Sequence, residues 1–222
     1  MKLKILLLNT VIFSTIIHAD LGQPVESPFS PTIQITKNLT TIMLNAGEVG
    51  NDSGENVTSY LLEKMKKGSI VLENGTNIGF CGEKTYVISI GINNYKNLSS
   101  LANAISDSKK MTNKIVSNCK NTKSNTIQNA TETDIINALK NVSQKATSKD
   151  SIIFYFSGHG VMVNNKNYLA PVDAKANRIT DIQHSFIDMS DISDISELLK
   201  FSKIKSGLMI FDAGRDKAFR RK

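Results

Sequence analysis

Three short apolar segments restrict the fold of this 222-residue chain more than any other feature. They are TYVISIG at 85–91, SIIFYF at 151–156 and GLMIF at 207–211, and each is rich in β-branched or aromatic residues. Continuous apolar runs of this length are typical of strands that are buried on both faces of a parallel sheet. The sequence therefore predicts a parallel sheet at the centre of a domain, and an apolar content of 40% is enough to build its core.

The segments between these strands have the apolar spacing of amphipathic helices. We expect helices within residues 101–116, 131–146 and 192–201, and a weaker strand at 125–130. Thr131 or Thr133 would cap the second helix, because a hydroxyl oxygen can accept a hydrogen bond from a free backbone amide of the first turn. This alternation predicts an α/β fold in which helices cover both faces of a mostly parallel sheet.

The first 19 residues have the three-part form of a secretory signal peptide. Lys2 and Lys4 precede an apolar stretch at 5–17, and Ala19 stands where cleavage is expected. We therefore expect residues 1–19 to be removed and the mature protein to be secreted or periplasmic. An uncleaved membrane anchor is the alternative.

The next part of the chain, residues 20–80, differs in composition from the residues after it. It is rich in Pro, Ser and turn-forming residues, and it contains only one short helical pattern, SYLLEKMKKG. This composition predicts a polar amino-terminal extension with little core of its own. We expect the main domain to span residues 81–222.

The formal net charge of +7 does not indicate a nucleic-acid partner. Much of the charge lies in the expected leader and in the last eight residues, RDKAFRRK, which leaves the body of the protein close to neutral. A nucleic-acid surface would also need basic and aromatic residues interleaved across one face, and the sequence lacks that pattern. We therefore expect no nucleic-acid partner, and no membrane association once the leader is removed.

Polar residues that come after the second and third apolar segments are the first candidates for a functional site. SGHG at 157–160 follows one segment, and DAG at 212–214 follows the other. Ligands usually bind beyond the carboxyl ends of parallel strands, where loops and helix amino ends converge. His159 between two glycines suits a general base, although a histidine that only completes a tight turn is the alternative. For Asp212 the alternative is a cap at the strand end.

Longer segments around these residues resemble a known family. YVISIGINNYKNLSSLANAISDSKKM, DSIIFYFSGHGVMVNNKNYLAPVDA and ISELLKFSKIKSGLMIFDAGRDKAF are similar, in order and spacing, to the caspase-like cysteine peptidases of family C14, especially the bacterial caspase-domain proteins and metacaspases. The resemblance covers roughly residues 84–219 and implies a caspase-like three-layer sandwich. The family continues further past its nucleophile, so we expect the carboxyl-terminal part to be missing, through truncation or because a second chain completes the sheet.

The resemblance implies a catalytic role for His159 and the loss of its partner. In the family, the SGHG histidine acts with a cysteine in a pattern like D-A-C, and Gly214 stands where that cysteine is expected. Glycine has no side chain that could attack a carbonyl carbon, so we expect the chain as written to be inactive. The oxyanion site of the family would use backbone amides near Gly160 and Gly214.

The resemblance to metacaspases also implies a specificity for arginine or lysine. The acidic residues of their specificity pocket match Asp107 and Asp212 here, with Ser157 beside them. A desolvated pair of carboxylates suits a guanidinium, because charge and fork geometry reinforce each other. The alternative for Asp107 is a carboxylate on the exposed face of a helix.

The two cysteines of the chain, Cys81 and Cys119, have no place in this chemistry. Cys81 precedes the first strand and Cys119 follows the first helix, so both should lie at the amino-end rim of the sheet, away from His159. Neighbouring thiols tend to pair in an exported protein, which makes a disulfide the expectation and two unrelated buried thiols the alternative.

Three functional hypotheses remain. The first is a caspase-like or metacaspase-like cysteine endopeptidase domain that has lost its nucleophile at Gly214. The second is a non-catalytic pseudopeptidase or peptide-binding module, and the third is a truncated relic. We expect a peptide or protein partner that carries Arg or Lys, no cofactor, and no metal, because the calcium-binding acidic positions of some metacaspases have no match here.

Overall fold

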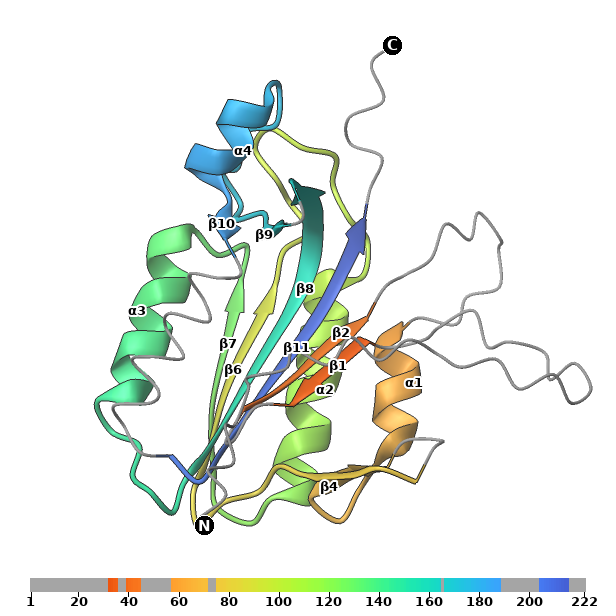
Figure 1. Ribbon diagram of the computed structural model, residues 1–222, viewed down its shortest axis with the longest axis vertical. Coiled ribbons are helices and arrows are strands. Elements are labelled where there is room, and N and C mark those ends of the chain that lie inside the picture. The colour runs from red at the N-terminus through yellow and green to blue at the C-terminus, as the bar shows by residue number, and fades with distance from the viewer. Residues whose placement is uncertain are drawn as a thin grey trace, which may run out of the picture.

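The structure, a computed structural model, describes residues 32–35, 39–44, 57–71, 75–164, 166–188 and 204–215. Its main element is a sheet in the order β1-β2-β11-β8-β6-β7, in which β9 pairs with β8 and β10 pairs with β9 (Figure 1). The expected signal peptide, the helix expected at 192–201 and the basic residues 216–222 lie outside the described residues.

The strands at the centre of this sheet run parallel to one another. Parallel pairs join β2 to β11, β11 to β8, β8 to β6 and β6 to β7, whereas β1–β2, β8–β9 and β9–β10 are antiparallel. The strands are β1 (Thr32–Ile35), β2 (Leu39–Leu44), β6 (Thr85–Gly91), β7 (Thr122–Gln128), β8 (Ser151–Val163), β9 (Lys166–Leu169), β10 (Ile187–Asp188) and β11 (Ser206–Arg215). The predicted parallel sheet is confirmed.

Helices cover the sheet on both faces, as Figure 1 shows. The bounds are α1 (Val57–Lys64), α2 (Ala104–Asn118), α3 (Glu132–Ser143) and α4 (Ile179–Ser185). Met111 and Ile115 of α2 pack with Ile153 on one face of the sheet. On the other face, Ile135 and Leu139 of α3 pack in a second cluster. Within the described residues, no helix is both long and apolar enough to cross a membrane.

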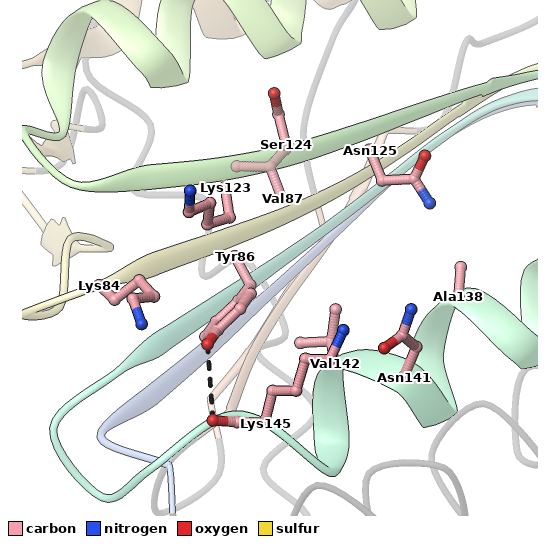
Figure 2. A pocket seen from close by; sticks show the side chains of 10 residues that line it. All are labelled: Lys84, Tyr86, Val87, Lys123, Ser124, Asn125, Ala138, Asn141, Val142 and Lys145. Atoms are coloured by element: carbon pink, nitrogen blue, oxygen red, sulfur yellow. Dashed lines mark hydrogen bonds between the residues drawn. The ribbon is translucent and has the colours of Figure 1, made fainter.

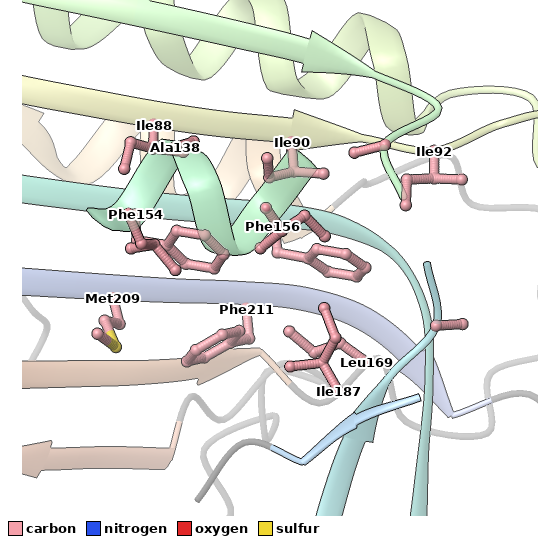
Figure 3. Packing of buried hydrophobic residues seen from close by; sticks show 14 of the residues in the cluster. Ile88, Ile90, Ile92, Ala138, Phe154, Phe156, Leu169, Ile187, Met209 and Phe211 are labelled. Carbon is pink, nitrogen blue, oxygen red and sulfur yellow. The ribbon is translucent and has the colours of Figure 1, made fainter. Parts of the chain in front are cut away.

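The α3 side of the core is built mainly from aromatic and branched residues of neighbouring strands (Figure 3). Ile88, Phe154 and Phe211 come from three adjacent strands, and the rings of Phe154 and Phe211 lie 5.9 Å apart between centroids. Full burial of such a side chain contributes about 2 kcal/mol to stability. This packing holds the central strands in register and fixes where their carboxyl ends lie.

The predicted helices differ from the observed ones at their ends. Thr131 is the N-cap of α3: its hydroxyl accepts from the Asp134 backbone amide, and the Asp134 carboxylate accepts from the Thr131 amide. The helix predicted within residues 101–116 corresponds to α2, but Leu101 lies before α2 begins. Val116, which the same spacing places on the apolar stripe, is 45% exposed.

The two longest strands continue further than the sequence predicts. The apolar run of β8 ends at residue 156, but the strand continues through SGHG to Val163, and β11 continues past the predicted end at Asp212 to Arg215. Mutual pairing explains both extensions, since the register continues from Ser206 beside Ser151 to Arg215 beside Gly160. His159 therefore lies within a strand, and neither a tight turn at His159 nor a strand-end cap at Asp212 is correct.

Residues 57–80 contribute apolar side chains to the core of the main domain. Helix α1 is followed by a small antiparallel sheet of β3 (Met65–Lys66), β4 (Ser69–Val71) and β5 (Asn77–Gly79). Leu61, Met65, Ile70, Ile78 and Phe80 from this region are buried in the cluster that lies between the sheet and α2. Polar residues lie between these apolar positions, so the sequence of this region has no continuous apolar run that would indicate a core.

The edge of β11 that faces away from β8 is also occupied by this amino-terminal region. β2 pairs with β11 from Leu39 beside Gly207 to Leu44 beside Asp212, and β1 pairs with β2. Among the described residues, the outer strands of the main path are thus β1 and β7.

Cys81 and Cys119 form a disulfide, with their Cα atoms 5.5 Å apart. Cys119 follows the last residue of α2, and Cys81 lies four residues before β6, so the bond closes the β6–α2 unit at the amino-terminal end of the strand. The turn at Gly68 lies directly on it: a Cβ added at Gly68 would be 2.7 Å from the Cys81 Sγ atom. The bond is therefore packed against the amino-terminal region.

Candidate functional site

His159 is buried at the carboxyl-terminal end of the sheet and is held by two residues of the loop that follows β6. Its backbone N–H donates to the Tyr95 hydroxyl oxygen at 2.8 Å, and the two rings lie 4.7 Å apart between centroids. Its ring Nε2 lies 2.8 Å from the Ser99 carbonyl oxygen. A carbonyl oxygen can only accept, so Nε2 carries the proton and the lone pair of the neutral ring is on Nδ1. This orientation suits a group that takes up a proton at Nδ1.

The loop at 92–103 is anchored at several points along its length. The Ile92 amide donates to the Ser157 carbonyl at 3.1 Å, and the Lys96 amide donates to the Val172 carbonyl at 2.9 Å. The side chain of Asn93 accepts from the Ile105 amide at 3.0 Å, which ties the loop to the start of α2. These bonds fix the positions from which Tyr95 and Ser99 contact His159.

The glycines beside His159 permit a close approach of neighbouring groups. A Cβ at Gly158 would lie 2.5 Å from the Tyr95 hydroxyl oxygen, and one at Gly160 would lie 2.7 Å from the Ala213 Cβ atom. Distances this short force something to move, so a larger residue would displace Tyr95 or β11. The two glycines thus have a steric role.

Gly214 lies next to His159 in the adjacent strand. The register of β8 and β11 pairs His159 with Gly214 and Ser157 with Asp212. Neighbouring strands are about 4.8 Å apart, and residues in register project to the same face of a sheet. The residue of β11 that lies in register with His159 is therefore a glycine, which has no functional group to present to the histidine.

Asp107 lies in the first turn of α2 and is only 3% exposed. The helix begins directly against the end of β6, where a Cβ at Gly91 would lie 2.5 Å from the Ala104 carbonyl oxygen. Lys110 Nζ lies 3.4 Å from the Asp107 carboxylate, but the lysine side chain is 55% exposed, so this ion pair is weak. The alternative of a helix carboxylate on an exposed face is wrong, because Asp107 is buried.

Asp212 is held by two hydroxyl groups that reach the same carboxylate oxygen. Thr58 Oγ1 donates to Oδ2 at 2.5 Å, and the Tyr155 hydroxyl donates to Oδ2 at 3.1 Å. Burial raises the pKa of Asp212, the Asp107 charge adds to that rise, and the two hydrogen bonds oppose it. Burial also raises the pKa of Tyr155 well above its ordinary value of 10.0, with help from the Asp212 charge, so its hydroxyl keeps its proton.

The three residues expected to form a specificity pocket converge on one face of the sheet. Ser157 is 5% exposed and lies beside Asp212 in the register of β8 and β11. Asp107 comes from α2 on the same face and is close enough for its charge to raise the pKa of Asp212. Gly160 continues the strand one residue past His159. The structure thus brings all the predicted strand-end residues to one end of the sheet, with the disulfide at the other end.

A hollow in the described part of the chain lies away from these residues (Figure 2). It has a volume of about 290 Å³ and is lined by the first half of β6 and β7 and by α3. Lys84, Lys123 and Lys145 contribute to its wall, and the Tyr86 hydroxyl donates to the Lys145 carbonyl at 3.5 Å. None of the site residues above lines it, so it takes no part in the candidate site. The described residues also contain no group of three or more His, Cys, Asp or Glu side chains that could hold a metal ion.

Four residues that contact the site are not found by reasoning from the sequence. Tyr155 has a usable signal, because it precedes Ser157 and His159 at a spacing of two and so shares their face of the strand. Tyr95 and Ser99 lie in the loop after the first strand, at the end of the sheet where function is expected. Thr58 has no signal, because it is remote in sequence and belongs to a region predicted to lack a core.

A mostly parallel sheet with helices on both faces and a buried histidine at the carboxyl-terminal end of its strands defines an α/β domain with a candidate site at that end. The family model of peptidase C14, described as the caspase domain, matches residues 84–222. This match covers more than half of the sequence, and the chain belongs to the caspase-domain family. The predicted caspase-domain family and α/β fold are confirmed.

One solved structure similar to this chain is the crystal structure of the Drosophila initiator caspase Dronc. The match has 15% sequence identity and a TM-score of 0.44, and it covers 60% of this chain and 49% of the Dronc chain. This chain thus spans about half the length of that caspase chain. No curated protein sequence matches the chain.

Proposed function

We propose that this chain is a caspase-domain protein that binds peptides through an arginine or lysine side chain but does not cleave them. The observation that carries this proposal is the pairing of His159 with Gly214 in adjacent strands. In the proposal, Gly214 stands where the cysteine nucleophile of the family is expected.

The argument against cleavage is that no thiol can replace the missing nucleophile. The sequence contains two cysteines, and both are in the Cys81–Cys119 disulfide at the opposite end of β6. His159 has the orientation of a general base, but a base needs an adjacent nucleophile from which to take a proton. Without a nucleophile there is no acyl-enzyme, whatever the backbone amides near Gly160 contribute to an oxyanion site.

The argument for cation binding rests on a buried carboxylate, Asp107, and a half-buried one, Asp212, on one face of the sheet. The ion pair of Asp107 with the exposed Lys110 is weak, and a better cation can displace that lysine. Asp212 has both of its described donors on Oδ2, and among the described residues no donor reaches Oδ1. A guanidinium or ammonium group would lower the cost of ionising Asp212 in a half-buried position beside the Asp107 charge.

Isothermal titration calorimetry with an arginine-ended peptide tests the binding. We expect Asp107→Asn and Asp212→Asn each to weaken the affinity about tenfold, and higher salt to weaken binding to the wild type. The same peptide with citrulline in place of arginine is the neutral ligand control, and Glu63→Gln, an exposed carboxylate on α1, is the protein control. Equal affinity for the arginine and citrulline peptides would refute the proposed cation site.

Fluorogenic reporters that end in arginine or lysine test the absence of cleavage. We expect the mature protein and its His159→Ala variant to give the same background signal. Hydrolysis by the wild type that disappears in His159→Ala would show that the site retains a nucleophile and that the proposal is wrong.

A second candidate function is an arginine- or lysine-directed cysteine endopeptidase in which Gly214 is a local loss. The retained orientation of His159 by Ser99 and Tyr95 favours this candidate. It predicts that Gly214→Cys hydrolyses the reporters and that Gly214→Cys combined with His159→Ala does not. Gly214→Ser is the matched control, since it adds a side chain without a thiol. A folded Gly214→Cys variant with no activity would refute the endopeptidase candidate, and peptide binding would then be the one remaining proposed function.

We also propose that the protein acts outside the cytoplasm. The Cys81–Cys119 disulfide supports this location, because disulfides form and persist in oxidising compartments. The signal peptide expected at residues 1–19 would provide the route.

A further inference from the structure

A buried hydroxyl from outside the family-matched residues lies in the candidate cation site. Thr58 belongs to α1, whereas the family model begins at residue 84. Its surface is 0% exposed, and its Oγ1 lies 2.5 Å from Asp212 Oδ2 and 2.6 Å from the Tyr155 hydroxyl oxygen. The three oxygen atoms form a compact hydrogen-bonded cluster in which the Thr58 hydroxyl contacts both the carboxylate and the Tyr155 hydroxyl.

The position of Thr58 is set by the packing of α1. Leu61 on the next turn is 0% exposed, and Met65 just after the helix is 1% exposed. Both lie in the same cluster as Ile210, which precedes Asp212 by two residues on β11. The strand partner of Asp212 in β2 is Leu44, so the backbone at this point is paired as well. The hydroxyl is therefore held in place by packing that is independent of its hydrogen bonds.

We propose that Thr58 is a positioning residue of the cation site: its hydroxyl holds Asp212 by Oδ2 and leaves Oδ1 for a bound guanidinium or ammonium group. This inference rests on the proposed cation binding. It makes the amino-terminal region, which lies outside the residues matched by the family model, a part of the binding site. Thr58 does not touch the ligand and acts only through Asp212.

The charges around Asp212 explain why a hydroxyl matters here. Among the residues that the structure describes, the titratable groups that face this carboxylate are Tyr155 from β8 and Asp107 from α2, with Lys110 on the outer side of Asp107. Burial and the Asp107 charge both favour the neutral form of Asp212, which cannot attract a cation. The Thr58 and Tyr155 hydroxyls favour the ionised form. Loss of the Thr58 hydroxyl should therefore raise the pKa of Asp212 and move cation binding to higher pH.

The test compares Thr58→Val, which keeps the shape and removes the hydroxyl, with Thr58→Ser, which keeps the hydroxyl. Thr58→Ala is a second deletion in case the valine variant fails to fold. Thr112→Val is the matched control, because Thr112 is also a buried helical threonine but bonds to Ser108 and Thr126. Affinity for the arginine-ended peptide is measured from pH 5 to pH 8, and the Asp212 carboxyl is titrated by ¹³C NMR in the same full-length proteins.

We expect Thr58→Val to bind about tenfold more weakly at pH 6, with the Asp212 titration and the rise in affinity both shifted to higher pH, and Thr58→Ser to restore both. Thr112→Val should change neither. If the wild type binds and Asp212→Asn binds more weakly, an unchanged affinity or an unchanged Asp212 titration in Thr58→Val overturns the inference alone. If the wild type does not bind the arginine peptide, the proposed function itself is overturned, and the inference with it.

Discussion

Removal of the Cys81–Cys119 disulfide should destabilise the protein by an amount that depends on the length of the loop that the bond closes. The two cysteines are 38 positions apart, so the bond closes a loop of about 39 residues that contains β6 and α2. In the loop-entropy model, a loop of this size restricts the unfolded chain by about 4 kcal/mol. We expect Cys81→Ala combined with Cys119→Ala to lower the free energy of unfolding by about that amount.

Urea denaturation measures this loss. With a slope of about 2 kcal/mol per molar urea, the unfolding midpoint should fall by about 2 M, and the slope should rise because the unfolded chain without the crosslink exposes more surface. Alanine is the replacement of choice because Cys119 is 3% exposed and lies in the apolar cluster with Met111 and Ile115. Chemical reduction of the wild type is the control, since it breaks the bond and keeps both side chains. A loss below about 1 kcal/mol in both proteins would refute the reasoning. Two freely alkylated thiols in the non-reduced protein would show that the bond does not form in solution.

Three further predictions concern local contacts. Gly160→Ala should destabilise the protein by about 1–3 kcal/mol, because the new Cβ would lie 2.7 Å from that of Ala213, and Ala213→Gly should restore most of the loss in urea denaturation. Thr131→Ala should lower the unfolding free energy by about 1 kcal/mol through loss of the α3 cap, whereas Thr133→Ala should have little effect in the same assay. Asp212 has a raised pKa in the folded state, so its contribution to stability is present below its ordinary pKa of 3.8 and is lost as the pH rises through the folded value. The wild type should therefore lose stability relative to Asp212→Asn between pH 4 and pH 7, and parallel pH profiles of the two proteins would contradict this.

The central strands could be predicted from the sequence because each is buried on both faces. TYVISIG is an unbroken run of the residues that a parallel sheet selects, and all seven positions of β6 are buried. The strand ends were less predictable. The register of β8 with β11 extends both strands past the apolar residues, and pairing with a distant strand leaves no local pattern.

The amino-terminal region could not be read in the same way, because its strands are short and their partners are remote. β3 has two residues, and β4 and β5 have three each, so no periodicity can develop within them. β2 depends on β11, which lies near the other end of the described chain. Only the finished packing shows that Leu61 and Phe80 are core residues.

Some residues of the candidate site could be predicted from the sequence and others could not. Asp107, Ser157 and Asp212 could be named because a family resemblance and the strand-end rule pointed to side chains. The Ser99 carbonyl that orients His159 could not be named, since every residue carries a carbonyl group and only the loop path selects this one. Thr58 belongs to the same class of contact, because it reaches Asp212 across 154 positions of sequence.

The place of β11 between β2 and β8 has a consequence for how the chain folds during synthesis. Ile42 of β2 pairs with Ile210 of β11. β2 is the first of the described parallel strands to be synthesised and β11 is the last, so β2 cannot pair with β11 until nearly the whole described chain has left the ribosome. Until then β2 has unpaired amide and carbonyl groups, and the edge of β8 is open as well. Contacts between such remote segments form slowly, and exposed edges favour pairing with other chains. Aggregation of nascent chains that end before residue 206 is the hazard that this sheet order creates.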